Sequence, residues 1–374
     1  MDGEVEPPCL SRTWNPACVK VKLRNDAHPK GEVRKHGAMT TLTLCKEAED
    51  LQRLLRGGRV YKPPFWEVWF GMEKFFAKRY GEVNVPNRIR MAKDLGMAIV
   101  CLGGININAG FHKHGQTSSG VARYCGGSLT SLKQLEEREL PNFDKTIEQW
   151  KHDQGLIRDA GLISWVVVPW CFHTIATSMG LRNFIIKLHK DYEFVDRALE
   201  WVEERTRLGI DTAIKEARPD VVLFDGDCAY QTGLMVHPTI FRRLVFERTK
   251  ETLSHLKPLG IPYAFHTDGK LDDVIPLLVD LGFSAVHGCE KAANDLGDLV
   301  RRFGDQIVLV GNMDVTFLYL STPEQVRRET ESMLRIGSRK GRFVAACNTS
   351  PLDNIPEENY LAMVQSIREF SPNG

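Results

Sequence analysis

The sequence has no strong excess of charge of either sign. Its 374 residues include 49 lysines and arginines against 48 aspartates and glutamates, which leaves a net charge of +1. Such a chain has no general attraction for nucleic acid or for an anionic membrane surface, so neither is expected as a partner. No apolar run approaches the ~20 residues that a membrane-spanning helix needs, and the N-terminus lacks a secretory apolar core.

Paired cysteines are also missing, because the nine cysteines are scattered and none stands in a Cys-x-x-Cys motif. This spacing disfavours both a zinc ribbon and a disulfide scaffold. Hydrophobic residues make up 43% of the chain and charged residues 26%, which is ordinary for a globular enzyme. The composition therefore predicts a cytoplasmic protein with reduced thiols.

Two parts of the chain differ in character. Residues 1–38 are polar, dotted with proline and without sustained periodicity, which predicts an N-terminal extension, partly disordered or wrapped on the surface. In residues 39–374, short apolar runs alternate with amphipathic helical segments. The runs expected to form strands are 65–70, 97–102, 162–169, 220–225, 262–266, 283–288, 307–312 and 342–347. The clearest helical patterns are 182–217, 238–260 and 322–338, the last with Thr322 as N-cap.

Apolar runs that alternate with helices are typical of parallel strands buried on both faces. Eight such units predict an α/β fold, a closed (β/α)8 TIM barrel in a single domain. The alternative is an open, doubly wound sheet. Residues 103–145, which include "GGININAGFHKHGQTSSGVARYCGG", are too polar and glycine-rich for a plain crossover. They predict a hairpin or lid inserted after the second strand, over one end of the barrel.

Polar residues follow the predicted strands at the ends where a barrel carries its active site. From the first strand onward they are Glu67; Trp170 and His173; Asp225 and Asp227; His266 and Asp268; His287 and Glu290; Asn312 and Asp314; Cys347 and Asn348. These positions are far apart in sequence, yet a barrel would bring them all to one rim. Their convergence is a stronger indication of a site than any single motif.

The residue types at this rim suit a metal ion. Zinc binds imidazole nitrogen, thiolate sulfur and carboxylate oxygen, and a catalytic zinc site keeps one position open. His266 and Cys347, with either Asp268 or Glu290, would form such a three-ligand site. Plainer interpretations stay open, because His266 alone would serve as a structural histidine and Cys347 as a small core residue.

The quoted segments also carry a family resemblance. They are "DLQRLLRGGRVYKPPFWEVW" near the start and, in the second half, "DGDCAYQTGLMVHPTIFRR", "HTDGKLDDVIPLLVDLGFSAVHGCEKAANDL", "VLVGNMDVTFLYLSTPEQVRRE" and "CNTSPLDNIPEENYLAMV". With them, the stretch from about Met39 to Phe370 resembles the uroporphyrinogen decarboxylase superfamily, which also contains cobalamin-linked methyltransferases. The resemblance implies a (β/α)8 barrel, paired as a homodimer, with its site at the C-terminal mouth.

Within that superfamily the chain is more similar to the methyltransferase branch. True uroporphyrinogen decarboxylases carry an arginine-rich segment after the first strand and an aspartate after the second. This chain has "WFGMEKFFAKRYG" and "CLGGININAG" there instead. The methyltransferase branch has a zinc signature of His-x-Cys and a later Cys. His266 and Cys347 occupy its first and last positions, and Asp268 stands in the middle.

The sequence thus predicts a zinc-assisted methyltransferase that moves a methyl group between a small methoxy- or methylamine-like substrate and a corrinoid (methylcobalamin). A partner protein would carry the corrinoid, because the chain has no Asp-x-His-x-x-Gly segment. The catalytic candidates are Asp225, Asp227 and Glu67, and the substrate-binding candidates are Trp170, His173, His287 and Asn348. One alternative is a metal-free decarboxylase-like lyase acting on a tetrapyrrole or other acidic substrate. Another is a non-catalytic binding protein on an inherited barrel.

Overall fold

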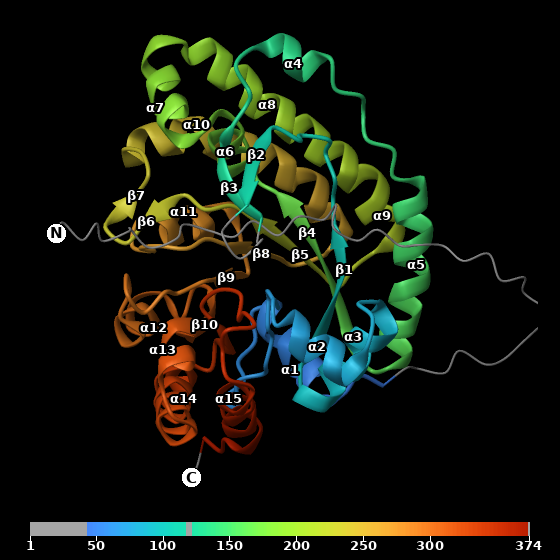
Figure 1. Cartoon of the computed structure of the whole chain (residues 1–374), viewed down its shortest axis with the longest axis vertical. Coiled ribbons are helices and arrows are strands. Elements are labelled where there is room, and N and C mark those ends of the chain that lie inside the picture. Colours follow the sequence, from blue (N-terminus) through green and yellow to red (C-terminus); the bar gives the residue numbers. More distant parts are fainter. Residues whose placement is uncertain (1–42, 117–121, 373–374) are drawn as a thin grey trace, which may run out of the picture.

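A parallel sheet forms the centre of the protein. The computed structural model describes residues 43–116 and 122–372, and the extension predicted at residues 1–38 lies outside them (Figure 1). Seven strands follow the order β1-β4-β5-β8-β9-β10-β11. They are β1 (Ile99–Gly104), β4 (Ile163–Pro169), β5 (Val221–Asp225), β8 (Tyr263–His266), β9 (Ala285–His287), β10 (Val308–Met313) and β11 (Phe343–Cys347). Each coincides with a predicted strand, and the α/β barrel prediction is confirmed.

The prediction of a strand at residues 65–70 is wrong. Phe65 alone pairs, through one parallel bridge to Met97 beside β1 and one to Ala345 in β11. Pro63 and Pro64 precede it, and proline has no N–H to donate to a ladder, so the pairing does not extend in that direction. The two bridges nevertheless join the edges of the sheet. The result is a TIM-barrel-like closed sheet rather than an open, doubly wound one.

Alternate residues of each strand belong to two different hydrophobic cores. On β4, Trp165 and Val167 face the barrel interior, whereas Val166 and Val168 pack in the layer between the strands and the helices. Helix α1 (Lys46–Leu55) contributes Ala48, Leu51, Leu54 and Leu55 to the interior core, so it closes the N-terminal end of the barrel. The parity of a residue in its strand therefore decides which core its side chain joins.

Helices cover the outside of the sheet (Figure 1). They are α2 (Glu73–Tyr80), α3 (Val85–Leu95), α5 (Asp144–Asp159), α6 (Cys171–Met179), α7 (Leu181–Lys190), α8 (Tyr192–Gly209), α9 (Lys215–Ala217), α10 (Pro238–Leu256), α11 (Val274–Leu281), α12 (Leu296–Phe303), α13 (Val315–Leu320), α14 (Pro323–Gly337) and α15 (Glu357–Glu369). A short π-helix, η2 (Ile210–Ile214), extends α8, and the 3-10 helices η3 (Lys257–Leu259) and η4 (Ser338–Lys340) extend α10 and α14. The helix predicted over 182–217 is divided at Asp191. The predicted cap of α14 is confirmed, because Thr322 forms a capping box with Gln325.

The predicted hairpin after the second barrel position is present. Strands β2 (His112–Gln116) and β3 (Ala122–Gly127) pair in antiparallel fashion, and the short helix α4 (Leu132–Glu136) follows. The base of the hairpin lies against the end of α6. A Cβ atom on Gly127 would lie 2.0 Å from the carbonyl oxygen of Ser178, and the Tyr124 hydroxyl donates to the Thr177 carbonyl at 2.7 Å. Figure 1 shows this hairpin beside α6.

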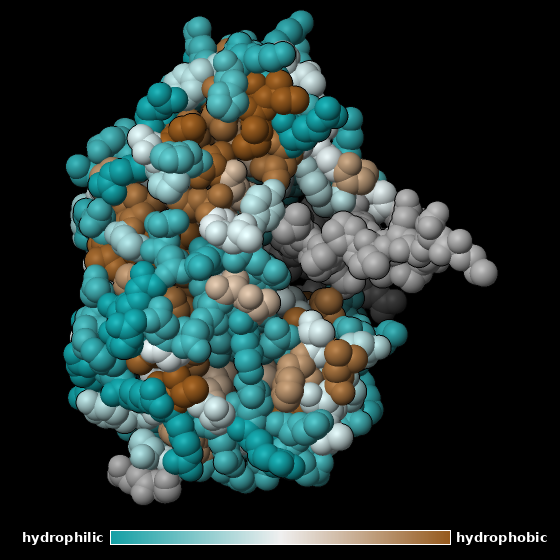
Figure 2. Space-filling model, turned by 90° about the vertical axis from the view of Figure 1, so that its left-hand side faces the viewer, coloured by the Kyte–Doolittle hydropathy of each residue, from teal (hydrophilic) through white to brown (hydrophobic). Residues whose placement is uncertain are grey.

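The surface mixes polar and apolar residues, and on the face shown in Figure 2 the apolar ones form several separate areas. The most exposed large apolar side chains of the described residues are Leu320 and Leu140, on different segments. Single exposed apolar side chains are ordinary for a folded protein. None of the helices within residues 43–116 and 122–372 combines the length and apolarity needed to cross a membrane.

Candidate metal centre

The register of three neighbouring strands aligns three polar residues at their C-terminal ends. Asp225 of β5 lies opposite His266 of β8, and His266 lies opposite His287 of β9. In β8, Ala264 belongs to the interior core and Phe265 to the outer one. Alternation therefore directs His266 toward the barrel axis, as the sequence predicts for a residue of the site.

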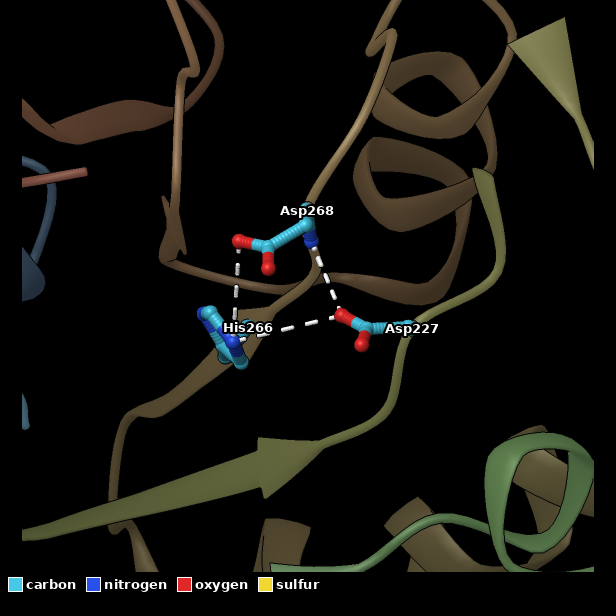
Figure 3. A group of neighbouring side chains, drawn as sticks. All are labelled: Asp227, His266 and Asp268. Carbon is cyan, nitrogen blue, oxygen red and sulfur yellow. Dashed lines mark hydrogen bonds and ion pairs between the residues drawn. The ribbon is translucent and has the colours of Figure 1, made fainter. Parts of the chain in front are cut away.

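Three side chains from this rim point toward one another (Figure 3). The Nε2 atom of His266 lies 4.0 Å from Oδ1 of Asp227 and 4.0 Å from Oδ1 of Asp268. The backbone N–H of Asp268 donates to Oδ1 of Asp227 at 3.0 Å, and one ligand atom from each residue lies within 4.8 Å of the others. His266 and Asp268 are predicted ligands, whereas Asp227 is predicted as a catalytic residue. A nitrogen and two carboxylate oxygens thus face one small volume.

The chemistry of this group fits a cation. The Oδ1 atom of Asp268 is buried and has no hydrogen-bond partner. Burial raises the pKa of Asp268 well above its usual value, and the nearby charges of Asp227, Glu290 and Asp225 raise it further. A buried carboxylate among like charges is costly unless a cation or a proton compensates it. A metal ion bound between His266 and the two carboxylates would supply that compensation.

His287 holds the other side of the His266 ring. The two Nδ1 atoms are 2.7 Å apart, and Nε2 of His287 lies 3.1 Å from the carbonyl oxygen of Cys347. Burial lowers the pKa of His287 well below its usual value, and the neighbouring His266 lowers it further. Both nitrogens of His287 therefore have protein partners. Its predicted role in substrate binding finds no support in this position.

Two further candidates stand next to the group. The backbone N–H of Asp227 donates to Nδ1 of His173 at 2.6 Å, while Nε2 of His173 is buried without a hydrogen-bond partner. Burial raises the pKa of Asp225. The substrate role of His173 and the catalytic role of Asp225 stay predictions. His173 lies beside Asp227, and Asp225 lies opposite His266 in the sheet.

Glu290 supports the loop that carries Asp268. Its Oε2 atom accepts a hydrogen bond from the N–H of Gly269 at 2.7 Å, and burial raises the pKa of its carboxyl group. Asn294, which the sequence did not single out, donates to the Gly269 carbonyl at 2.9 Å and accepts from the Leu271 N–H at 3.0 Å. The one sequence signal for this loop was the glycine directly after Asp268. Gly269 has a φ of +88°, a conformation that favours glycine.

Cys347 is not part of the group, although its thiol is a predicted ligand. In β11, Val344 and Ala346 face the interior, whereas Ala345 and Cys347 face the outer layer. The Sγ atom lies 4.0 Å from Sδ of Met363 in α15. Burial raises the pKa of the Cys347 thiol well above its usual value, and Glu67 raises it further. The expected ligand set is therefore corrected: the side chain of Cys347 points to the outer layer, away from His266. A buried thiol with a raised pKa also does not readily become the thiolate that binds a metal.

Glu67 also lies on the outer side, away from the His266 group. Its Oε1 atom accepts a hydrogen bond from the N–H of Cys347 and its Oε2 atom one from the hydroxyl of Tyr360, both at 3.2 Å. Burial raises the pKa of Glu67 to about 8. The residue is therefore a buried acid beneath α15. Its predicted role as a general acid at the mouth is not supported by this position.

The remaining substrate candidates stabilise the fold. Trp170 packs edge-on against Phe265, with ring centroids 4.8 Å apart, and its indole N–H donates to Thr249 at 2.9 Å. Asn348 accepts a hydrogen bond from the Val315 N–H at 3.2 Å, so it fixes the start of α13. Both side chains are committed to protein neighbours, and contact with a substrate stays a prediction that their positions do not favour.

Comparison with known proteins gives two kinds of similarity. The family model described as uroporphyrinogen decarboxylase (URO-D) matches residues 123–370. The uroporphyrinogen decarboxylase of Methylococcus capsulatus is 26% identical over 220 residues, 57% of this chain and 60% of that protein. The one from Alkalilimnicola ehrlichii is 25% identical over 262 residues, 65% and 68% of the two chains. The match thus spans less than two thirds of the Methylococcus relative.

The second similarity is structural. A methyltransferase from Methanosarcina mazei has a TM-score of 0.68 to this chain and 18% sequence identity, over 87% of this chain and 98% of that one. At this identity the likeness concerns the fold.

Proposed function

The chain belongs to the uroporphyrinogen decarboxylase (URO-D) family, and on this premise we propose that it is a metal-assisted, corrinoid-dependent methyltransferase. It would move a methyl group between a small methylated substrate and a corrinoid that a partner protein carries. The observation that carries the proposal is the buried, unpartnered Oδ1 of Asp268 facing His266 and Asp227. A cation bound there would compensate the buried carboxylate and complete the set of ligand atoms.

The proposed ligands are His266, Asp227 and Asp268, and the proposed metal is Zn²⁺. Zinc accepts nitrogen and carboxylate oxygen and, with three protein ligands, keeps a position for a reactant. When bound, it would supply Lewis acidity to the heteroatom that carries the methyl group, which improves a leaving group or lowers the pKa of a nucleophile. An oxygen of Asp227 takes the place that the sequence assigns to the sulfur of Cys347, so the centre is harder than a thiolate site.

The remaining residues of the rim would position the substrate. Since Nδ1 of His173 accepts a hydrogen bond from Asp227, its Nε2 carries the proton when the ring is neutral. This buried N–H is without a partner in the protein and would donate to a heteroatom of the substrate. Asp225, opposite His266 in the sheet, stays a catalytic candidate. Glu290 would keep Asp268 in place through the Gly269 N–H.

The charge of the mouth favours a neutral or cationic substrate. The groups that raise the pKa of Asp268 are three other carboxylates, those of Asp227, Glu290 and Asp225. A substrate with many carboxylates would be repelled by such a cluster, whereas a methylamine- or methoxy-type compound would not. This supports the methyltransferase over the second candidate, a metal-free decarboxylase of a tetrapyrrole, which the names of the matched relatives would favour.

Elemental analysis of the purified protein tests the ligand set. We expect about one metal ion per chain after reconstitution with zinc, lost in His266→Ala and Asp268→Asn. The matched control is Cys347→Ala, which removes a buried side chain of the same rim but should retain the metal. Metal lost from Cys347→Ala and kept in Asp268→Asn would contradict the proposed ligands. If the wild-type protein binds no metal, the proposal fails and the decarboxylase alternative takes its place.

Turnover assays then test the reaction. Methylated amines and methoxy compounds would be supplied with free or protein-bound cob(I)alamin, and methylation of cobalt followed by its absorbance change. Uroporphyrinogen serves as the comparison substrate. Turnover of uroporphyrinogen by the metal-free protein, without methyl transfer, would contradict the proposal. Light scattering of the same sample would test the predicted homodimer.

A further inference from the structure

We infer that His287 is a positioning residue that fixes the tautomer of His266 and directs the Nε2 lone pair of His266 toward Asp227 and Asp268. The inference deepens the proposed function, on which it rests for the presence of a metal. It changes the role of His287 from a substrate contact to the group that orients a ligand. It is carried by two hydrogen bonds, one at each nitrogen of the His287 ring.

The first hydrogen bond sets the proton on His287. Its Nε2 atom lies 3.1 Å from the carbonyl oxygen of Cys347. A carbonyl oxygen only accepts, so Nε2 of His287 is the donor and carries a proton. Cys347 belongs to β11 and His287 to β9. The acceptor is therefore part of the sheet backbone, and it does not depend on the side chain at position 347.

The second hydrogen bond determines which nitrogen of His266 carries the proton. The two Nδ1 atoms are 2.7 Å apart, which requires one proton between them. A proton on Nδ1 of His287 would make that ring an imidazolium. His287 is 1% exposed and its hydrogen-bond partners are a peptide carbonyl and another imidazole, neither of which compensates a buried positive charge. Nδ1 of His287 is therefore the acceptor, and Nδ1 of His266 the donor.

The tautomer of His266 follows. With its proton on Nδ1, a neutral His266 presents an unprotonated Nε2 to the two carboxylate oxygens 4.0 Å away. The Nε2 lone pair and the two carboxylate groups then face one small volume, which is the environment that a metal ion completes. The opposite tautomer would place an N–H there, which would donate to a carboxylate and block the position. Outer partners of this kind typically change metal affinity 10- to 100-fold.

The register of the sheet makes this arrangement rigid. His266 and His287 are paired residues of adjacent parallel strands, so their side chains project from the same row of the barrel. The rings lie with centroids 4.9 Å apart and tilted by 38°. The His266 ring also meets Trp69 edge-on, with ring centroids 5.5 Å apart. The imidazole thus contacts two rings, and rotation of its χ2 angle would break the bond to His287.

Nitrogen NMR of metal-free protein labelled at histidine is the direct test. In the wild type we expect His266 to be protonated at Nδ1 and His287 at Nε2. His287→Leu keeps a similar volume without a nitrogen, and we expect His266 to lose its fixed Nδ1–H tautomer there. Zinc affinity, measured by competition with a chelator, should fall 10- to 100-fold in His287→Leu. His287→Asn, which retains an acceptor near the Nδ1 position, should recover part of that loss.

Two results would overturn the inference: a wild-type His266 protonated at Nε2, or a folded His287→Leu with unchanged tautomer and unchanged zinc affinity. If His287→Leu does not fold, the wild-type spectrum alone decides, since it reports the tautomer without any substitution. Failure of the proposed function looks different, because the wild type would then bind no metal while the spectrum still reports the state of both rings. Cys347→Ala, which leaves the backbone acceptor in place, should behave as the wild type in both measurements.

Discussion

Replacement of Glu67 by glutamine should make the stability of the protein less sensitive to a rise in pH between the two pKa values of Glu67, 4.5 and about 8. Glu67 is 7% exposed, and burial raises its pKa from 4.5 to about 8. Between these two values the folded protein holds a proton that the unfolded chain releases. The stability associated with Glu67 is therefore fully present below pH 4.5 and is lost as the pH rises toward 8.

The size of the effect follows from the pKa shift. Each pH unit within this window changes the free energy of unfolding by about 1.4 kcal/mol. From pH 5 to pH 8 the wild type should lose roughly 3 to 4 kcal/mol through Glu67. Glutamine keeps the geometry, because its oxygen can accept from the Cys347 N–H and its amide can donate to the Tyr360 oxygen. Its side chain does not titrate, so this loss should be absent.

Guanidinium unfolding of both proteins across this pH range, with a chelator present, measures the difference. Other buried acids contribute the same slope to both proteins and cancel. Tyr360→Phe is the matched control, because it removes one hydrogen bond from Glu67 but leaves the group that titrates, so its pH slope should remain. Parallel pH profiles for wild type and Glu67→Gln would refute the reasoning and mean that Glu67 keeps an ordinary pKa in the folded protein.

Three further substitutions test other parts of the structure. Gly269→Ala would place a Cβ atom 2.5 Å from the carbonyl oxygen of Ala229, so we expect the loop to shift. The zinc affinity, measured by competition with a chelator, should then fall. An unchanged affinity would contradict the role of this loop in holding Asp268. Trp170→Phe removes the bond to Thr249 and should lower the free energy of unfolding by about 1–3 kcal/mol with no change in metal content; lost metal at full stability would return Trp170 to the site. Thr322→Ala removes the cap of α14 and should cost about 1 kcal/mol in chemical denaturation, which an unchanged midpoint would exclude.

Most of the barrel could be predicted because buried parallel strands read as apolar runs. The runs at 220–225 and 262–266 became β5 and β8 with almost the same bounds. The first strand was overestimated, since an aromatic run has high strand propensity whatever precedes it. The pair Pro63 and Pro64 was visible in the sequence, but how far a ladder extends depends on the partners on both sides, which only the closed sheet provides.

The candidate site was predictable in place but not in composition. His266 and Asp268 stand two residues apart at one strand end, so their proximity follows from the sequence. Asp227 lies in the loop after β5, and its approach to Asp268 through a backbone N–H has no sequence signal. Cys347 was predicted as a ligand from its residue type at a strand end, and the family resemblance indicated the same position. Its parity relative to Ala346 decides against the thiol, and parity at a strand end is uncertain by one residue until the register is known.

Closure of the barrel at Phe65 depends on residues that are made late in synthesis. The residues that meet across this seam are far apart, and Glu67 and Cys347 are separated by 280 positions. At a synthesis rate of ~5–20 residues per second, the early segment waits on the order of 10–60 seconds for β11 to leave the ribosome. Phe65, 1% exposed in the finished fold, lacks its bridge to Ala345 of β11 during that time. The carbonyl of Cys347 that anchors His287 belongs to the same strand, so the proposed ligand His266 acquires its final orientation only after β11 has been made.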